Sequence, residues 1–370
     1  MGRSPITLLI GPRQCGKTTL ARLFAPADSQ NYFDLEDPTI AALLENPKAI
    51  LSPLTGTVVI DEAQRLPEIF PVLRVLADRE RAPARFLVLG SASPDLTRQA
   101  SESLAGRVEI VEMRGFDLAE TGESTLHRLW LRGGFPRAYL AASDEDASQW
   151  LKDFIQTFLE RDLAQLGFGI PPTTLHRFWT MVSHYHGQTW NGSEIAGSMG
   201  IAPNTARRYL DVLTQTFMIR QLQPWYENVG KRLVKSPKIY LRDSGLFHRL
   251  QGIANHTQLQ THPKLGASWE GFALEETLRA LRPDDAYFYA VHSGSELDLL
   301  LFKDGRRIGV EIKHTDAPRI TRSLRIAFED LRLDEALIVY PGDRTFQLDE
   351  RTRAVPLFRI HNFQESAKDR

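Results

Sequence analysis

The stretch Gly11-Pro12-Arg13-Gln14-Cys15-Gly16-Lys17-Thr18 decides the fold of the first part of this 370-residue chain. It has the spacing G-x-x-x-x-G-K-[ST], follows the apolar run Ile6–Ile10 and opens a helical pattern over Lys17–Phe24. In such a loop, backbone N–H groups and the helix N-terminus surround a phosphate. The lysine then bridges the β- and γ-phosphates of a nucleotide, and the threonine holds Mg²⁺. The sequence therefore predicts a nucleotide site formed by Gly11, Pro12, Arg13, Gln14, Cys15, Gly16, Lys17, Thr18 and Thr19.

A pair of carboxylates at the end of another predicted strand fits the same site. The β-branched run Thr57–Ile60 ends in Asp61 and Glu62. Asp61 is predicted to bind Mg²⁺ together with Thr18, and Glu62 is placed to polarise an attacking water. This arrangement favours hydrolysis of the nucleotide over its use as a phosphate donor. The alternative is an acidic turn after a buried strand.

Two further positions are candidates at this site. Ser91 follows the strand-like run Phe86–Gly90, where a small polar residue can contact the γ-phosphate or the water, and Ser93 suits a cap of the next helix. Arg107 opens the predicted strand Val108–Val111 and is either an arginine finger or a surface arginine. A finger that acts across a subunit interface would favour a ring or a dimer.

Composition excludes several classes of protein. The hydrophobic fraction of 42% and charged fraction of 25% are those of a globular chain. With 45 Lys and Arg against 46 Asp and Glu, the net charge of -1 excludes a globally basic nucleic-acid binder but not a local basic patch. A single cysteine, Cys15, excludes an internal disulfide and a cysteine-based zinc site. No apolar run reaches the ~18 residues of a membrane helix, and no signal peptide is present, so we expect a cytoplasmic protein.

The chain changes character twice along its length. Strand-like and helical stretches alternate up to Gly115, which predicts a parallel sheet with right-handed crossovers. The pattern is mostly helical over 126–223, and strands return from about Lys238. The predicted fold class is therefore α/β: a parallel-sheet core over residues 1–115, a helical linker and winged helix over 116–242, and an α/β domain over 243–370.

Residues 191–210 predict a helix, a tight turn and a second helix. Gly200 suits a left-handed turn, and Pro203 suits the first turn of the second helix. The later stretches FMIRQLQPW and KIYLRD then form a β-hairpin wing. Over 203–242 there are eight basic residues against two acidic ones, a local charge of +6 that favours contact with DNA phosphates. The alternative is a structural lid or a protein-docking module. The basic residues are Arg207, Arg208, Arg220, Lys231, Arg232, Lys235, Lys238 and Arg242.

A second group of carboxylates is predicted near the C-terminus. The strand-like run ELDLLLF contains Asp298, and the run RIGVEIK contains Glu311 and Lys313. Residues two apart on a strand face the same side, so Glu311 and Lys313 point into one site. Asp298 and Glu311 can bind Mg²⁺ for phosphodiester attack, with Lys313 orienting the water and Glu270 on the preceding helix completing the site. Glu275 is the alternative to Glu270, and an inactive fold or a solvated sheet face is the alternative to a nuclease.

Several motifs together resemble the prokaryotic AAA-type ATPases joined to the family catalogued as domain of unknown function 4143. The resemblance covers nearly the whole chain and implies an AAA ATPase core, a winged-helix middle part and a C-terminal restriction-endonuclease-like fold. It implies loop, magnesium, base and sensor roles for Lys17, Thr18, Asp61, Glu62 and Ser91, and a place near the nucleotide for Arg107. The motifs are GPRQCGKTTLARLF, VVIDEAQ, LVLGSAS, LAGRV, LRGGFP, FLERDL and NVGKRLVKSPKIYLRDSGL.

Two features depart from the family pattern. Arg114-Gly115-Phe116 stands where a Pro-Leu-Ser stretch is usual, and ten residues precede the loop where relatives usually have an upstream segment. Together, the observations predict a protein that binds and hydrolyses ATP with Mg²⁺ and acts on DNA through Arg207, Arg208 and the basic wing, with a nuclease-like C-terminal domain. The alternative is an ATP-driven switch or regulator that binds a protein partner and has an inactive nuclease-like fold.

Overall fold

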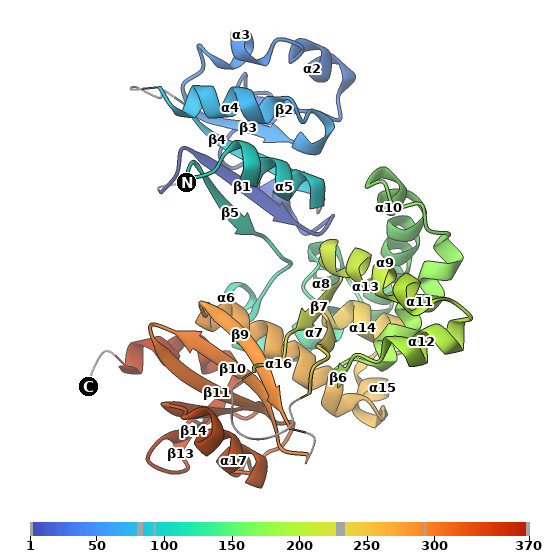
Figure 1. Cartoon of the computed structure of the whole chain (residues 1–370), viewed down its shortest axis with the longest axis vertical. Coiled ribbons are helices and arrows are strands. Elements are labelled where there is room, and N and C mark those ends of the chain that lie inside the picture. Colours follow the sequence, from blue (N-terminus) through green and yellow to red (C-terminus); the bar gives the residue numbers. More distant parts are fainter. Residues whose placement is uncertain (1–2, 80–83, 92–93, 227–233, 292–293, 368–370) are drawn as a thin grey trace. The chain divides into compact units, whose positions relative to one another are not determined.

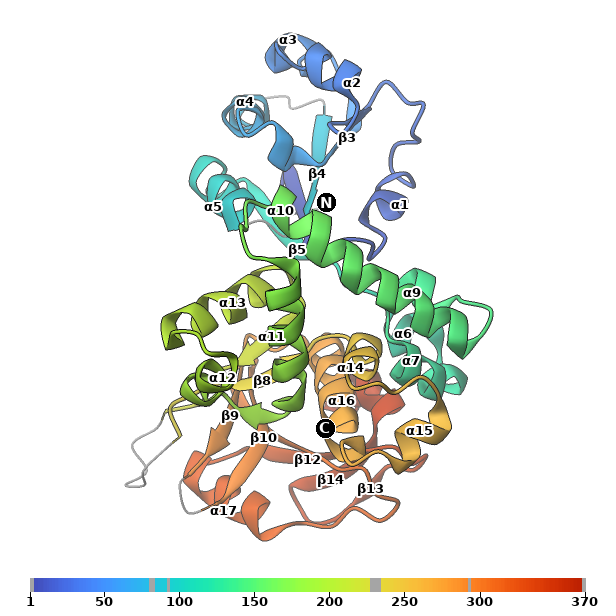
Figure 2. The same cartoon turned by 90° about the vertical axis from the view of Figure 1, so that its right-hand side faces the viewer.

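The computed structural model describes residues 3–79, 84–91, 94–226, 234–291 and 294–367. The chain divides into two compact units, drawn in Figures 1 and 2. Unit 1 comprises Met1–Gly115 with Gln215–Phe217, and unit 2 comprises Phe116–Thr214 with Met218–Arg370. No helix among the described residues has the length and apolar character needed to cross a membrane.

Unit 1 is built on a five-stranded parallel sheet with the strand order β2-β3-β4-β1-β5 (Figure 1). The parallel sheet predicted for this part of the chain is confirmed. Helix α1 ends earlier than predicted, at Ala21, and the chain continues in turns up to Pro26. The elements are β1 (Ile6–Gly11), α1 (Lys17–Ala21), β2 (Tyr32–Asp34), α2 (Pro38–Leu43), α3 (Pro47–Leu51), β3 (Gly56–Asp61), η1 (Ala63–Arg65), α4 (Ile69–Ala77), β4 (Ala84–Ser91), α5 (Pro94–Ser103) and β5 (Val108–Glu112).

Both faces of this sheet are apolar, as expected of parallel strands covered by helices. Alternate residues of β1 illustrate this: Ile6 and Leu8 pack in one core together with residues of α3, α4 and α5. Leu9 points to the opposite face and packs in a smaller core that contains Ala21 of α1. Figure 2 shows α1 on one side of the sheet and α4 and α5 on the other. All strands run in the same direction, so their carboxyl ends meet at one edge.

The first half of unit 2 is helical, as predicted, and is built around one large apolar core. Helix α9 continues through a π-helical turn, η3, into α10. The elements are α6 (Leu118–Thr121), η2 (Glu123–Thr125), α7 (Leu126–Arg132), α8 (Pro136–Tyr139), α9 (Asp144–Thr157), η3 (Phe158–Asp162), α10 (Leu163–Gln165), α11 (Pro172–His184), β6 (Gln188–Thr189), α12 (Gly192–Met199), α13 (Pro203–Gln215), β7 (Ile219–Leu222), β8 (Lys238–Leu241), α14 (Ser244–Leu250) and α15 (His256–Thr261).

Helices α12 and α13 are joined by a short turn at Gly200, whose φ of 69° is in the left-handed region. The Asn191 side chain caps α12 by accepting from Glu194 N–H. Ala196 and Ala206 are buried between the two helices and their neighbours, where small side chains permit close approach. Strands β7 and β8 pair antiparallel, and β6 pairs with the other edge of β8.

The second half of unit 2 contains a separate six-stranded sheet with the order β13-β14-β12-β11-β10-β9. Helix α16 packs in the core on one face, with Leu299, Leu301 and Val310, and α17 packs on the other with Leu300 and Ile338. This alternation is that of strands covered on both faces. The elements are α16 (Leu265–Leu281), β9 (Asp285–Ala290), β10 (Glu296–Lys303), β11 (Arg306–Ile312), α17 (Arg322–Leu331), β12 (Glu335–Tyr340), β13 (Phe346–Gln347), β14 (Thr352–Pro356) and η4 (Leu357–Ala367).

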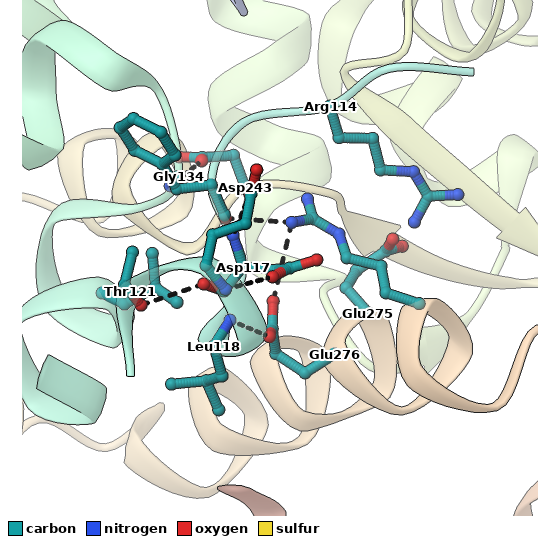
Figure 3. Close-up of polar contacts among 12 residues, drawn as sticks. Arg114, Asp117, Leu118, Thr121, Gly134, Asp243, Glu275 and Glu276 are labelled. Carbon is teal, nitrogen blue, oxygen red and sulfur yellow. Dashed lines mark hydrogen bonds and ion pairs between the residues drawn. The ribbon is translucent and has the colours of Figure 1, made fainter. Parts of the chain in front are cut away.

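The first residues of unit 2 are bound to α16 by buried polar groups (Figure 3). Glu276 accepts a hydrogen bond of 2.8 Å from Leu118 N–H, and Arg279 donates to the Phe116 carbonyl across 2.9 Å. Asp243 accepts from Gly134 N–H at 2.8 Å and also caps α14. Burial raises the pKa of the Glu276 carboxyl to about 7, because α16 holds it almost fully away from water.

Candidate nucleotide site and C-terminal carboxylate cluster

The predicted phosphate loop lies between the carboxyl end of β1 and the first turn of α1. Gly11 is required there, because a Cβ atom at this position would lie 2.0 Å from the Met113 carbonyl oxygen. Gly16 precedes α1 with a φ of 103°, which other residues rarely adopt. The Lys17 ammonium is buried and donates to the Gly11 and Pro12 carbonyls at 3.0 and 2.7 Å, so it is held against the loop.

Asp61, at the carboxyl end of β3, is the centre of a small hydrogen-bond network. Its Oδ2 atom accepts from the Thr18 hydroxyl and from the Tyr32 hydroxyl, each at 2.8 Å. Its Oδ1 atom accepts from Glu62 N–H at 3.0 Å. A carboxylate and a hydroxyl are the oxygen ligands that Mg²⁺ prefers, so Thr18 and Asp61 fit this ion. Sequence reasoning missed Tyr32, which lies in β2 beside β3.

Glu62 has an uncommon backbone conformation, with φ 56° and ψ 43°. Such strained residues cluster at functional sites, because the surrounding structure must hold them in place. The Gln64 amide donates a hydrogen bond to the Glu62 carboxylate. Burial, with a smaller effect of the Asp61 charge, raises the pKa of Glu62, which increases its strength as a base once ionised.

Cys15 is buried within the loop, with its sulfur 3.9 Å from Lys17 Nζ and 3.8 Å from the Met113 carbonyl oxygen. Its thiol therefore faces the protein interior at the foot of the loop.

The two other candidates lie at different ends of the sheet. Ser91 pairs in register with Gly11, so its backbone is beside the loop, whereas its side chain and the whole of Ser93 lie outside the described residues. Arg107 is at the opposite edge: its carbonyl accepts from Ile6 N–H at 3.3 Å, and its guanidinium pairs with Asp78 at 2.5 Å. Strand β1 separates Arg107 from Gly11 by roughly 17 Å at about 3.3 Å per residue. Within one chain, Arg107 therefore lies far from the nucleotide site, contrary to the prediction.

The C-terminal carboxylates lie together in unit 2. Asp298 Oδ2 accepts from Ile312 N–H at 2.8 Å, which joins β10 to β11. Glu311 is buried, pairs with Lys313 at 3.0 Å and accepts from the Thr321 hydroxyl at 3.0 Å. Burial raises the pKa of Glu311. Burial alone lowers the pKa of Lys313, but the Asp298 and Glu311 charges outweigh it and raise that pKa above its ordinary value.

Glu270, and not Glu275, belongs to this cluster. The Glu270 carboxylate accepts from the Tyr240 hydroxyl at 2.6 Å, and Lys238 Nζ lies 3.4 Å away. Lys238 also pairs with Glu296 and lies 3.8 Å from Asp298. Sequence reasoning missed Lys238 and Tyr240 as members of the cluster, because they come from β8, far earlier in the chain.

The positions of the basic side chains on β7 and β8 correct the prediction of a basic wing that contacts DNA. Lys238 is buried among carboxylates, and Arg220 and Arg242 both pair with the buried Glu275. Three of the eight basic residues thus neutralise acidic residues of unit 2 and are not available to DNA phosphates. Lys231 and Arg232 lie outside the described residues. The remaining three, Arg207, Arg208 and Lys235, are exposed.

Fold and site together define a P-loop protein of the AAA class. Residues 3–122 match the AAA domain, residues 123–257 match domain of unknown function 8612, and residues 265–360 match domain of unknown function 4143. The chain therefore belongs to the family in which an AAA domain is joined to domain of unknown function 4143.

Two relatives match over most of their length. The chain is 53% identical over 358 residues to the uncharacterized proteins Rv2008c of Mycobacterium tuberculosis and Mb2031c of Mycobacterium bovis, with 97% of this chain and 81% of each relative covered.

Solved structures are more distant. The Holliday junction branch migration motor RuvB of Thermotoga maritima is 19% identical, with a TM-score of 0.28, over 58% of this chain and 81% of that chain. The DNA clamp loader delta protein of Bacillus subtilis is 13% identical, with a TM-score of 0.24, over 57% and 84% of the two chains. At these scores, neither likeness supports a conclusion about activity.

Proposed function

We propose that unit 1 binds ATP with Mg²⁺ and hydrolyses it. The observation that supports this most directly is the 2.8 Å hydrogen bond between the Thr18 hydroxyl and Asp61 Oδ2, at the edge of the sheet where the phosphate loop begins. It brings a loop hydroxyl and a strand-end carboxylate to one point. An acidic turn without function would not need a threonine of the loop as its partner.

Each residue has a separate task in this proposal. Lys17 leaves the loop carbonyls to bind the β- and γ-phosphates, while the loop N–H groups surround them. Thr18 and Asp61 would hold Mg²⁺, which neutralises charge that develops on the phosphates. Glu62, with its raised pKa, accepts a proton from the attacking water. Ser91 is proposed to contact the γ-phosphate or this water.

The test is equilibrium binding of ATP and release of phosphate by Lys17→Ala. We expect the variant to lose nucleotide binding or turnover, because no other ammonium of the loop replaces Lys17. Lys48→Ala, an exposed lysine of α3, is the matched control and should behave like the wild type. Turnover retained by Lys17→Ala would overturn the assignment of the loop.

A second function, contact with DNA, is favoured by the order of elements around α13. The order helix α11, strand β6, helices α12 and α13, then strands β7 and β8, is that of a winged helix. Arg207 and Arg208 are exposed on α13, and Arg207 pairs only with the half-buried Asp211 among the contacts described for it. We propose that α13 contacts DNA phosphates through these two arginines.

The remaining proposals concern organisation. The order α16, antiparallel β9, β10 and β11, then α17 and a parallel β12, supports a restriction-endonuclease-like fold for the C-terminal part. Domain boundaries at 1–115, 116–242 and 243–370 and a cytoplasmic location also remain predictions. A protein partner and an oligomer are the alternatives that the DNA and mixing experiments below distinguish.

A further inference from the structure

The restriction-endonuclease-like fold implies a divalent metal ion held by Glu270, Asp298 and Glu311. The described residues do not fit this ion, because an ammonium group lies among their carboxylates. Lys238 Nζ is 3.4 Å from Glu270 Oε1 and 3.8 Å from Asp298 Oδ1, and it also pairs with Glu296. Among the described residues, no group of three or more His, Cys, Asp and Glu side chains is arranged to hold a metal ion.

Lys238 is a fixed part of this cluster and not a mobile surface side chain. Its side chain is 4% exposed, and its ammonium lies 5.7 Å from the centre of the Phe288 ring. Strand β8, which contains it, pairs with β7 through Leu222 and Lys238. A buried ammonium without partners would be costly, so the surrounding carboxylates are what permit it there.

The hairpin that presents Lys238 is attached to α16 at a second point. Arg220 of β7 donates two hydrogen bonds to Glu275, and Arg242, just after β8, lies 3.9 Å from the same carboxylate. Glu270 and Glu275 are both on α16. The hairpin is thus bound to α16 by two sets of ion pairs, which hold β8 beside the carboxylate cluster.

The other half of the cluster is neutralised from within the sheet. Glu311 has Lys313 and Thr321 as partners, and Asp298 accepts from a backbone N–H. Mg²⁺ would have to displace a buried ammonium that already pairs with three carboxylates. Since like charges repel, the Lys238 ammonium opposes binding of a divalent cation at this cluster.

We infer that Lys238 is the cation of this carboxylate cluster, in place of a divalent metal ion, and that the C-terminal site does not bind catalytic metal while β8 holds this position. The inference rests on the proposed fold of the C-terminal part and is independent of ATP hydrolysis. ATP turnover measured on the same variants therefore distinguishes its failure from that of the proposed function.

The test is a titration of the full chain with Mn²⁺ in the absence of nucleotide, with free Mn²⁺ followed by electron paramagnetic resonance. Wild type and Asp298→Asn should bind the same number of ions, because Asp298 is engaged by protein groups. Lys238→Met, which keeps the length of the side chain but removes its charge, should bind one additional ion per chain. Asp298→Asn in the Lys238→Met background should remove that ion, and Lys238→Arg should behave like the wild type.

Two outcomes would overturn the inference. One is a Mn²⁺ ion bound by the wild type and lost in Asp298→Asn, which would show that the cluster binds metal with Lys238 present. The other is a folded Lys238→Met protein that gains no ion. If Lys238→Met does not fold, the comparison of wild type with Asp298→Asn alone decides.

Discussion

The Thr18 hydroxyl donates to Asp61 Oδ2 across 2.8 Å, and this bond joins the first turn of α1 to the end of β3. The two residues are 43 positions apart, and a parallel sheet brings them to the same edge. The bond places the Asp61 carboxylate beside the last residue of the phosphate-loop motif. A nucleotide-bound Mg²⁺ would replace this hydrogen bond, and the Thr18 and Asp61 oxygen atoms would then be its ligands.

Thr18→Ala should therefore retain ATP binding through Lys17 but lose the stimulation of ATP turnover by Mg²⁺. We expect turnover to fall by about 10²-fold, as for other losses of a charge-stabilising group in a nucleotide site. Phosphate release against Mg²⁺ concentration measures the effect. Thr55→Ala, an exposed threonine of unit 1, is the control. A Thr18→Ala protein with the wild-type magnesium dependence would contradict the assignment.

Arg107 lies at the end of the sheet opposite the phosphate loop, so we predict that it acts only on the nucleotide of a second copy of the chain. Arg107→Ala should then lose turnover while retaining its own ATP binding. A mixture of Arg107→Ala with Lys17→Ala should recover activity, because one variant provides the nucleotide and the other the arginine. Phosphate release across mixing ratios measures this. Unchanged turnover in Arg107→Ala would contradict the prediction and would leave Arg107 a structural role in its ion pair with Asp78.

Contact between α13 and DNA predicts a particular salt dependence. Removal of two phosphate contacts by Arg207→Ala with Arg208→Ala should reduce the slope of log affinity against log salt by about 2. The matched control is Arg322→Ala with Arg325→Ala, a pair of exposed arginines on α17. An unchanged slope in the α13 variant would exclude this helix as the DNA contact and favour a protein partner.

Glu276 predicts a pH dependence of stability in unit 2. Its pKa is about 7 in the folded chain, against 4.5 for an unburied glutamate. The folded state therefore holds a proton that the unfolded state releases, and this stabilisation is lost as pH rises from about 4.5 to 7. Glu276→Gln keeps the acceptor for Leu118 N–H and should not show this loss.

Urea denaturation midpoints at several pH values test this prediction. The advantage of Glu276→Gln over the wild type should grow from pH 5 to about pH 7 and then stay constant. His186 and His248, with pKa values lowered by burial to about 3 and about 4, act in the opposite direction in both proteins and cancel in the comparison. Glu123→Gln, at an exposed position, should follow the wild type. A constant difference between Glu276→Gln and wild type at every pH would contradict the prediction.

The nucleotide site could be predicted because its residues are local in the sequence. A glycine-rich loop between a strand and a helix, and an acid pair ending another strand, retain their meaning without tertiary information. Arg107 shows the limit of this reasoning. Arg107 precedes β5, which runs parallel to β1, so it lies at the end of the sheet opposite the phosphate loop. This position follows from the sheet topology and not from the residues around Arg107.

The C-terminal cluster was predicted only in part, for a different reason. Glu311 and Lys313 share a face because strands alternate, and the order of elements brought Asp298 and Glu270 beside them. Lys238 counted as a basic residue of the wing, since charge along a sequence does not tell which face a strand presents. Its burial depends on the packing of β8 against α16, which no local pattern encodes.

The central claim, ATP hydrolysis by unit 1, is tested most directly with Glu62→Gln. ATP affinity and phosphate release are measured in parallel on the wild type and the variant with Mg²⁺. We predict that the wild type hydrolyses ATP, and that Glu62→Gln binds it with similar affinity but turns it over about 10²-fold or more slowly, because the proton acceptor is lost. Equal turnover by the two proteins, or no turnover by the wild type, would contradict the account.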